Sequence, residues 1–210
     1  VTIAEVLKDA GYRTGMSGKW HLSETIPLKN VQDQLKWLSH QVDSGNFAPP
    51  ETYPHNRGFE DFWGIIWGVI DYFDPFSLVH NGDPVKEVPE DFYMTDFITD
   101  NSLKFIDEFS RDQQPFFLYV SYTSPHWPLH ALPEDIEKYR GKYDDGWDSL
   151  RVRRYRRMLE LGLFNRKTAP LAKNESNLSW EDCKRKDWEA AHMEVHAAMV
   201  DRMDQGIGKI

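Results

Sequence analysis

The chain has 210 residues, 40% of them hydrophobic, which is enough apolar material to bury a core. Its longest apolar runs, such as residues 116–120, fall far short of the roughly 18 residues that a membrane span needs, so a transmembrane segment is excluded. With 34 acidic and 25 basic residues the net charge is −9, the wrong sign for a dedicated nucleic-acid binder. A small anionic ligand would therefore need a local basic pocket.

Signals for a helix open the chain. Thr2 and Glu5 have the spacing of a capping box, apolar residues follow at helical intervals, and Gly11 suits the left-handed position that ends a helix. The pattern predicts a short helix followed by a short strand over residues 12–17, which ends at Gly18.

The next part of the chain has weaker periodicity. Residues 23–54 are expected to form a long loop with a helical patch over residues 31–38. In the aromatic stretch that follows, a turn over residues 81–83 is predicted to join two extended pieces, residues 77–79 and 85–88.

A helix and a strand are then predicted in direct succession. Apolar spacing indicates a helix over residues 95–110, and the continuous apolar run over residues 116–122 is typical of a strand covered on both faces. A helix followed by a buried strand favours the α/β class.

Two further helices are expected near the end of the chain. The first has an apolar stripe over residues 152–159, arginines on its solvated faces and an end at Gly162, and the second begins near Ser179. One face of the second helix is expected to carry Trp188, Ala191, Val195, Ala198, Met199 and Met203.

Polar residues follow two of the predicted strands, at the position where open α/β sheets bind ligands. Lys19 and His21 follow the first strand and are two residues apart, so in an extended segment both side chains leave on one face. His126 follows the second strand between prolines that stiffen its loop. The residues alone leave two interpretations open: an anion site with acid and base groups, or hydrogen-bonded structural histidines.

The residues also resemble a known family. Residues 2–22 (TIAEVLKDAGYRTGMSGKWHL) are similar to the second signature of the formylglycine-dependent sulfatases, members of the alkaline phosphatase superfamily. The resemblance continues through residues 56–59, 71–73, 115–119, 124–129, 139–144 and 197–204. It implies part of a three-layer α/β sandwich with a mostly parallel central sheet.

The resemblance implies a role for each candidate residue. Lys19 would contact the sulfate, and His21 would remove a proton so that sulfate is expelled. His126 would hydrogen-bond the ester oxygen and help to protonate the leaving alcohol. Apart from the resemblance, Trp127 is expected to contact the substrate because it is next to His126. Ser23 stands where many members of the family have Gly, a change that we expect to be mild.

The resemblance further implies a calcium ion and a formylglycine nucleophile made from a Cys or Ser. The chain contains neither the Cys-x-Pro/Ala-x-Arg motif nor the Asp and Asn calcium ligands of the family, and its single cysteine, Cys183, is not in that motif. No metal ligand is therefore assigned. We expect residues 1–210 to be the central part of a single catalytic domain in a longer protein, and to be inactive alone.

The expected substrate is a sulfate ester, either a small molecule or a sulfated glycan, and the family suggests a periplasmic or secreted location. Two alternatives stay open. One is a phosphate or phosphonate monoester hydrolase of the same superfamily; the other is a non-catalytic relative that binds sulfated glycans through Lys19, His21 and His126.

Overall fold

The computed structural model describes residues 1–23, 48–172 and 178–210. They form two compact units, Val1–His130 with Val200–Ile210, and Ala131–Met199. The predicted helical patch over residues 31–38 lies outside the described residues. Within the three described ranges, no helix combines the length and apolarity needed to cross a membrane.

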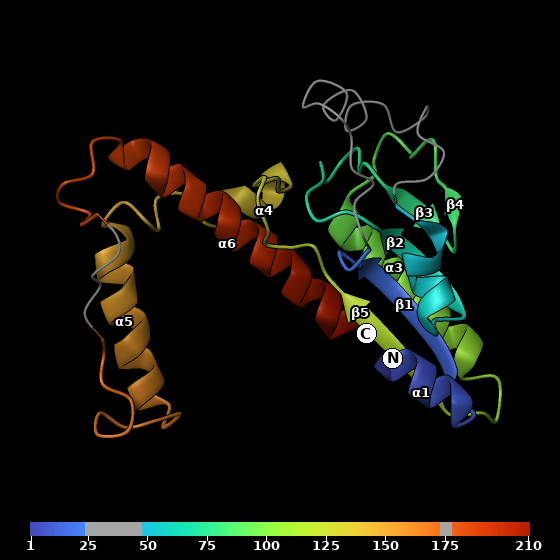
Figure 1. Ribbon diagram of the computed structural model, residues 1–210. Helices are drawn as coiled ribbons and strands as arrows, with labels where there is room; N and C mark the ends of the chain where they lie inside the picture. The colour runs from blue at the N-terminus through green and yellow to red at the C-terminus, as the bar shows by residue number, and fades with distance from the viewer. Residues whose placement is uncertain (24–47, 173–177) are drawn as a thin grey trace. The chain divides into compact units, whose positions relative to one another are not determined.

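The larger unit is built on a five-stranded sheet of order β4-β3-β2-β1-β5 (Figure 1). The strands are β1 (Arg13–Lys19), β2 (Asp61–Ile65), β3 (Leu78–His80), β4 (Asp83–Pro84) and β5 (Phe116–Ser121). Strand β1 is parallel to both β2 and β5, whereas β3 and β4 are antiparallel additions beside β2. The predicted α/β class with a mostly parallel sheet is confirmed.

Helices α1 (Ile3–Asp9) and α3 (Met94–Phe109) cover opposite faces of this sheet. On one face, the Ser17 hydroxyl donates a hydrogen bond to the carbonyl oxygen of Ile98 in α3, at 3.0 Å. On the other face, Met16 shares a buried cluster with Ala4 of α1. Side chains of neighbouring strand residues point to opposite faces, so β1 is covered on both sides.

The first helix and strand form where the capping box and the apolar pattern predict them. Thr2 and Glu5 make both bonds of the capping box. Strand β1 begins one residue later than predicted and continues through Gly18 to Lys19. Gly18 has φ +120°, and a Cβ there would lie 1.9 Å from the Ser121 carbonyl oxygen. Only glycine allows this close approach of β5.

The prediction that the 116–122 strand is covered on both faces is wrong for the described chain. β5 is an edge strand that pairs with β1 alone among the described strands, and Phe116 and Tyr119 are 38% and 45% exposed. An apolar run is buried on both faces only where other layers cover it.

Strand β2 was not predicted, because Gly64 interrupts its aromatic residues. Two short 3-10 helices that each begin at a proline, η1 (Pro50–Thr52) and η2 (Pro54–Arg57), precede it. The predicted turn joins β3 to β4, but residues 85–88 form no strand. The Val85 N–H still donates to the Leu78 carbonyl oxygen, at 2.9 Å, but β4 itself ends at Pro84.

The smaller unit is helical and contains α4 (Pro133–Glu137), α5 (Gly146–Glu160) and most of α6 (Lys186–Lys209). The arginines at positions 153, 154, 156 and 157 of α5 are exposed, as expected for a solvated amphipathic helix. Helix α6 begins seven residues after the predicted Ser179, whose hydroxyl instead accepts a hydrogen bond from the Asp182 N–H. Trp188 and Ala191 are exposed and Ala190 is buried, so burial at the start of α6 does not follow the predicted apolar face.

Candidate active site

Lys19 is the last residue of β1 and the first candidate residue of the site. The Ser121 hydroxyl donates a hydrogen bond to its carbonyl oxygen, at 2.9 Å, and so ties the ends of β1 and β5 together. The side chain is half-buried, and burial lowers the pKa of its ammonium group. No carboxylate among the described residues pairs with it, which leaves the ammonium group available to an anion.

His21 lies two residues beyond β1 in the left-handed region, with φ 54°. Its N–H donates to the Ile66 carbonyl oxygen, at 3.2 Å, and its ring packs against Gly68. Although the ring is partly exposed, loss of water lowers its pKa, and the positive charges of Lys19 and His126 lower it further. These two charges act on His21 because the fold brings the three side chains near one another.

His126 is held by the loop that follows β5. The buried hydroxyl of Tyr72 lies 2.9 Å from the Thr123 carbonyl oxygen and 3.0 Å from that of His126, and its single proton serves both. The His126 ring is exposed, and its Nδ1 lies 2.5 Å from the Trp127 carbonyl oxygen. With Nδ1 donating to that oxygen, Nε2 accepts a hydrogen bond when the ring is neutral and donates one when it is charged.

His130, four residues after His126, connects two loops. The Tyr72 N–H donates to its Nδ1, at 3.3 Å, and the Tyr93 hydroxyl donates to its carbonyl oxygen, at 2.9 Å. Its ring also stacks on Phe73, with centroids 5.9 Å apart. Through Tyr72, His130 is therefore connected to the loop that carries His126.

A cavity of about 330 Å³, which we name the Trp67–Trp127 cavity, opens beside the site. Its lining includes Trp67, Asp71, Asp74, Phe76, Trp127 and Pro128. Trp67 precedes the glycine that supports His21, and Trp127 follows His126. Two lining residues are thus next in sequence to residues of the site, although the lining contains none of Lys19, His21 and His126. The predicted substrate contact Trp127, which is 68% exposed, lies in the cavity wall.

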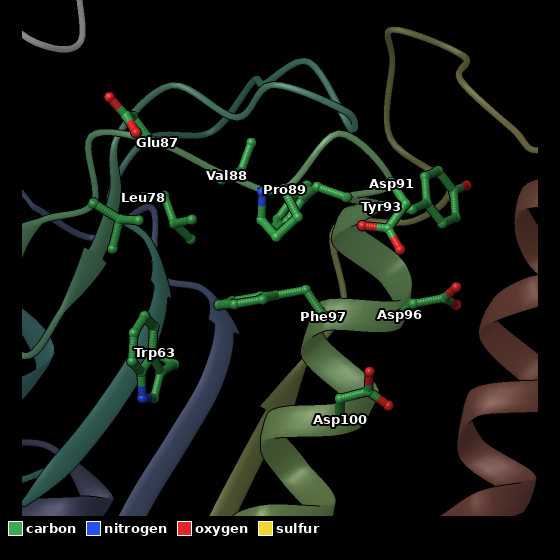
Figure 2. A pocket seen from close by; sticks show the side chains of 12 residues that line it. Trp63, Leu78, Glu87, Val88, Pro89, Asp91, Tyr93, Asp96, Phe97 and Asp100 are labelled. Carbon is green, nitrogen blue, oxygen red and sulfur yellow. The ribbon is translucent and has the colours of Figure 1, made fainter.

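A second cavity of about 450 Å³ lies between the sheet and α3 (Figure 2). Phe97 points from α3 toward Leu78 and Trp63, whereas the Asp96 side chain points away from them (Figure 2). Arg202 donates two hydrogen bonds to the Asp96 carboxylate, at 2.7 and 2.5 Å. The lining of this cavity contains none of the candidate residues Lys19, His21 and His126.

The site offers one ammonium group and two imidazoles, groups that can bind an anion and exchange protons. A cation and two imidazoles gather where parallel strands end, as expected for an open α/β sheet. Gly68 and Tyr72, which support the two histidines, were not identified from the sequence. The signal for them was the end of β2, a third parallel strand whose carboxyl end reaches the same edge of the sheet.

Known proteins that are similar to this chain are sulfatases. The family model described as Sulfatase matches residues 1–210. An uncharacterized sulfatase of Schizosaccharomyces pombe is 32% identical over 228 residues, which cover 99% of this chain and 36% of that relative. An arylsulfatase of Klebsiella aerogenes is 30% identical over 222 residues, which cover 100% of this chain and 42% of that relative. The chain thus spans less than half the length of these two relatives.

Solved structures share the fold. Ps i-CgsB in complex with k-i-k-neocarrahexaose covers 99% of this chain at 24% identity, with a TM-score of 0.56, and the match takes up 34% of that protein. BT4656 in complex with its substrate D-glucosamine-2-N,6-O-disulfate is 19% identical, with a TM-score of 0.52. The match covers 99% of this chain and 45% of that protein. These likenesses confirm the expected sulfatase fold. Because the family model matches every residue, the chain belongs to the sulfatase family.

Proposed function

We propose that the complete protein containing this chain hydrolyses sulfate monoesters in the manner of an arylsulfatase. The observation that carries the proposal is the grouping of Lys19, His21 and His126 at the carboxyl ends of parallel strands, in a chain that belongs to the sulfatase family. Sulfate transfer needs a fixed cation beside the charged oxygens and a proton for the departing alkoxide. These three residues supply both.

Each residue has a separate task in this proposal. The Lys19 ammonium binds the sulfate oxygens, and partial burial strengthens that attraction. Neutral His21 accepts a proton during release of sulfate, and its lowered pKa keeps it neutral. His126 directs Nε2 outward, because Nδ1 is engaged with Trp127, and donates a proton to the ester oxygen of the leaving alcohol.

The nucleophile and the metal belong to residues elsewhere in the complete protein. A formylglycine would supply the attacking oxygen, but Cys183 lies before Lys184 and Arg185 and does not match the motif that yields this residue. Among the described residues, no three His, Cys, Asp or Glu side chains are grouped to hold a metal ion. The described residues therefore do not fit a calcium site, and no step above depends on calcium.

Sulfated saccharides are the substrate class that the neighbours suggest. BT4656 was solved with a disulfated glucosamine as its substrate, and Ps i-CgsB with a neocarrahexaose. A periplasmic or secreted location is part of the same proposal, because extracellular glycans are reached there.

The test is sulfate release from 4-nitrophenyl sulfate by the complete protein and by its Lys19→Met, His21→Ala and His126→Ala variants. We expect turnover by the complete protein and a loss of about a hundredfold or more for Lys19→Met and His21→Ala. The 210-residue chain alone should show no turnover above background, since it has no nucleophile motif. Faster release of phosphate from 4-nitrophenyl phosphate would favour a phosphate monoester hydrolase, and binding of sulfated glycans without turnover would favour a non-catalytic relative.

A further inference from the structure

The Trp67–Trp127 cavity is positioned to receive the part of the substrate that carries the sulfate. Its two tryptophans are next in sequence to Gly68, which contacts the His21 ring, and to His126. These two neighbours in the sequence connect the cavity to the site where Lys19 would hold a sulfate. The volume of about 330 Å³ falls at the lower end of the range for small-molecule sites, about 300–1,000 Å³.

The walls of the cavity suit a flat apolar face on the ligand. The Trp127 indole is 68% exposed, although tryptophan is highly buried on average. Trp67 is half-buried, with its ring edge against Phe76 at a centroid distance of 6.4 Å. Exposed indole faces bind ring-shaped ligands through their apolar surface. The C–H face of a pyranose ring is such a surface.

Two carboxylates define the polar side of the cavity. Asp71 Oδ1 accepts hydrogen bonds from the N–H groups of Phe73 and Asp74, at 2.8 and 3.2 Å, and this turn fixes its orientation. The exposed Asp74 carboxylate has no partner among the described residues. Ionised carboxylates only accept hydrogen bonds, so they suit hydroxyl donors. They also repel any further anionic group on the ligand.

We propose that the Trp67–Trp127 cavity binds the ring of a hydroxylated, otherwise uncharged saccharide that bears one sulfate ester, and that Asp71 and Asp74 disfavour a second anionic group. This inference rests on the proposed function and adds the substrate class to it. The preferred substrates are monosulfated neutral sugars, and polyanionic glycans are poor substrates.

The test compares two pyranoses that differ in charge, glucose 6-sulfate and glucosamine-2-N,6-O-disulfate. For the complete protein, we expect kcat/KM for the monosulfated sugar to exceed that for the disulfated sugar by at least tenfold. Asp74→Asn keeps a polar side chain but removes the charge, and should reduce that ratio about fivefold. Asp71→Asn, which retains the side-chain oxygen that accepts the hydrogen bonds of the turn, should also reduce the ratio. Glu108→Gln removes one charge from the exposed surface of α3, outside the cavity, and should leave the ratio unchanged.

A binding measurement separates this proposal from the proposed function. Calorimetric titration with glucose 6-sulfate of the complete protein in which the formylglycine precursor is replaced by Ala reports binding without hydrolysis, and Asp74→Ala in that background should weaken it about tenfold through loss of the hydroxyl contact. Binding that depends on Asp74, together with no turnover by the unmodified protein, supports the cavity and overturns the sulfatase proposal. Turnover with equal kcat/KM for the two sugars, or with a ratio that Asp74→Asn does not change, overturns the cavity proposal alone.

Discussion

The imidazole ring of His21 packs directly over the Cα of Gly68. A Cβ at residue 68 would lie 2.2 Å from Cε1, 2.3 Å from Nε2 and 2.6 Å from Nδ1 of His21. Three nearly equal distances mean that the ring presents its face to residue 68. Any side chain larger than hydrogen at this position therefore displaces the ring.

Replacing Gly68 by Ala in the complete protein should reduce kcat for 4-nitrophenyl sulfate by about a hundredfold, because a shift of about 1 Å in a reacting group is that costly. Gly208→Ala is the matched control, since a Cβ there meets no atom within 4 Å, and it should retain full activity. Steady-state kinetics on both variants, with circular dichroism to verify folding, provides the measurement. Full activity of a folded Gly68→Ala variant would contradict the role given to His21.

Tyr72 is expected to stabilise the loop that carries His126. Burial raises the pKa of Tyr72 well above its usual range, so the hydroxyl stays protonated and keeps donating to the Thr123 and His126 carbonyl oxygens. Tyr72→Phe leaves two carbonyl groups without this donor, and should lower the free energy of unfolding by about 1–2 kcal/mol. It should also lower kcat/KM, because the loop loses its anchor.

The control for Tyr72 lies in the smaller unit, where the Tyr155 hydroxyl donates to the Ala169 carbonyl oxygen, at 2.8 Å. Tyr155→Phe removes one hydroxyl of the same kind and should leave kcat/KM unchanged. Urea unfolding and steady-state kinetics on the two variants separate stability from positioning. If Tyr72→Phe lost stability but kept full activity toward esters that need a proton donor, the hydroxyl would not position His126.

The lowered pKa of His21 predicts the acid side of the pH profile. Since neutral His21 is the proton acceptor in release of sulfate, kcat should fall only below pH 6.5, the ordinary pKa of histidine. Lys19→Met removes a positive charge that disfavours the imidazolium, so it should move the acid limb to higher pH as well as reduce the rate. The pH dependence of kcat in the two proteins gives the comparison, and an acid limb above pH 6.5 in the unmodified protein would contradict the shift.

The same shift affects stability with a definite sign. In the unfolded chain His21 takes up a proton near pH 6.5, but in the folded chain only at lower pH. The contribution of His21 to stability is therefore fully present above pH 6.5 and is lost as the pH falls toward the folded pKa. Between pH 7.5 and 5.5, the unmodified chain should lose more free energy of unfolding than His21→Gln. Equal losses in urea titrations would show that the folded pKa is not lowered.

Local signals were sufficient for the parts of the fold that depend on neighbouring residues. The Thr2–Glu5 capping box and the apolar spacing of α3 determine those helices through contacts within a few residues. Strand β2 was missed because Gly64 has no side chain to continue its pattern. A Cβ there would lie 1.8 Å from the Gly18 carbonyl oxygen, so the glycine is required by the approach of β1, a contact between distant parts of the chain.

The same distinction between local contacts and contacts distant in sequence applies to the site. The spacing of Lys19 and His21 indicated a shared face, and the effect of Lys19 on the His21 pKa shows that the two are close. The supports of the histidines could not be predicted, because Gly68 and Tyr72 act through contacts 47 and 54 residues away along the chain, with His21 and with His126. Without a prediction of β2, the sequence does not indicate that the loop after this strand lies at the edge of the sheet where the histidines lie.

The contribution of His126 to the rate of ester cleavage is expected to increase with the basicity of the leaving group. 4-Nitrophenolate leaves readily without one, whereas an alkoxide does not, so His126→Ala should slow an alkyl sulfate by about a hundredfold or more relative to 4-nitrophenyl sulfate. His196→Ala, an exposed histidine of α6, is the control and should slow neither ester. The ratio of kcat/KM for the two esters in each variant is the readout. Equal losses on both esters would assign His126 to binding, since a proton donor acts mainly on the ester whose leaving group is the stronger base.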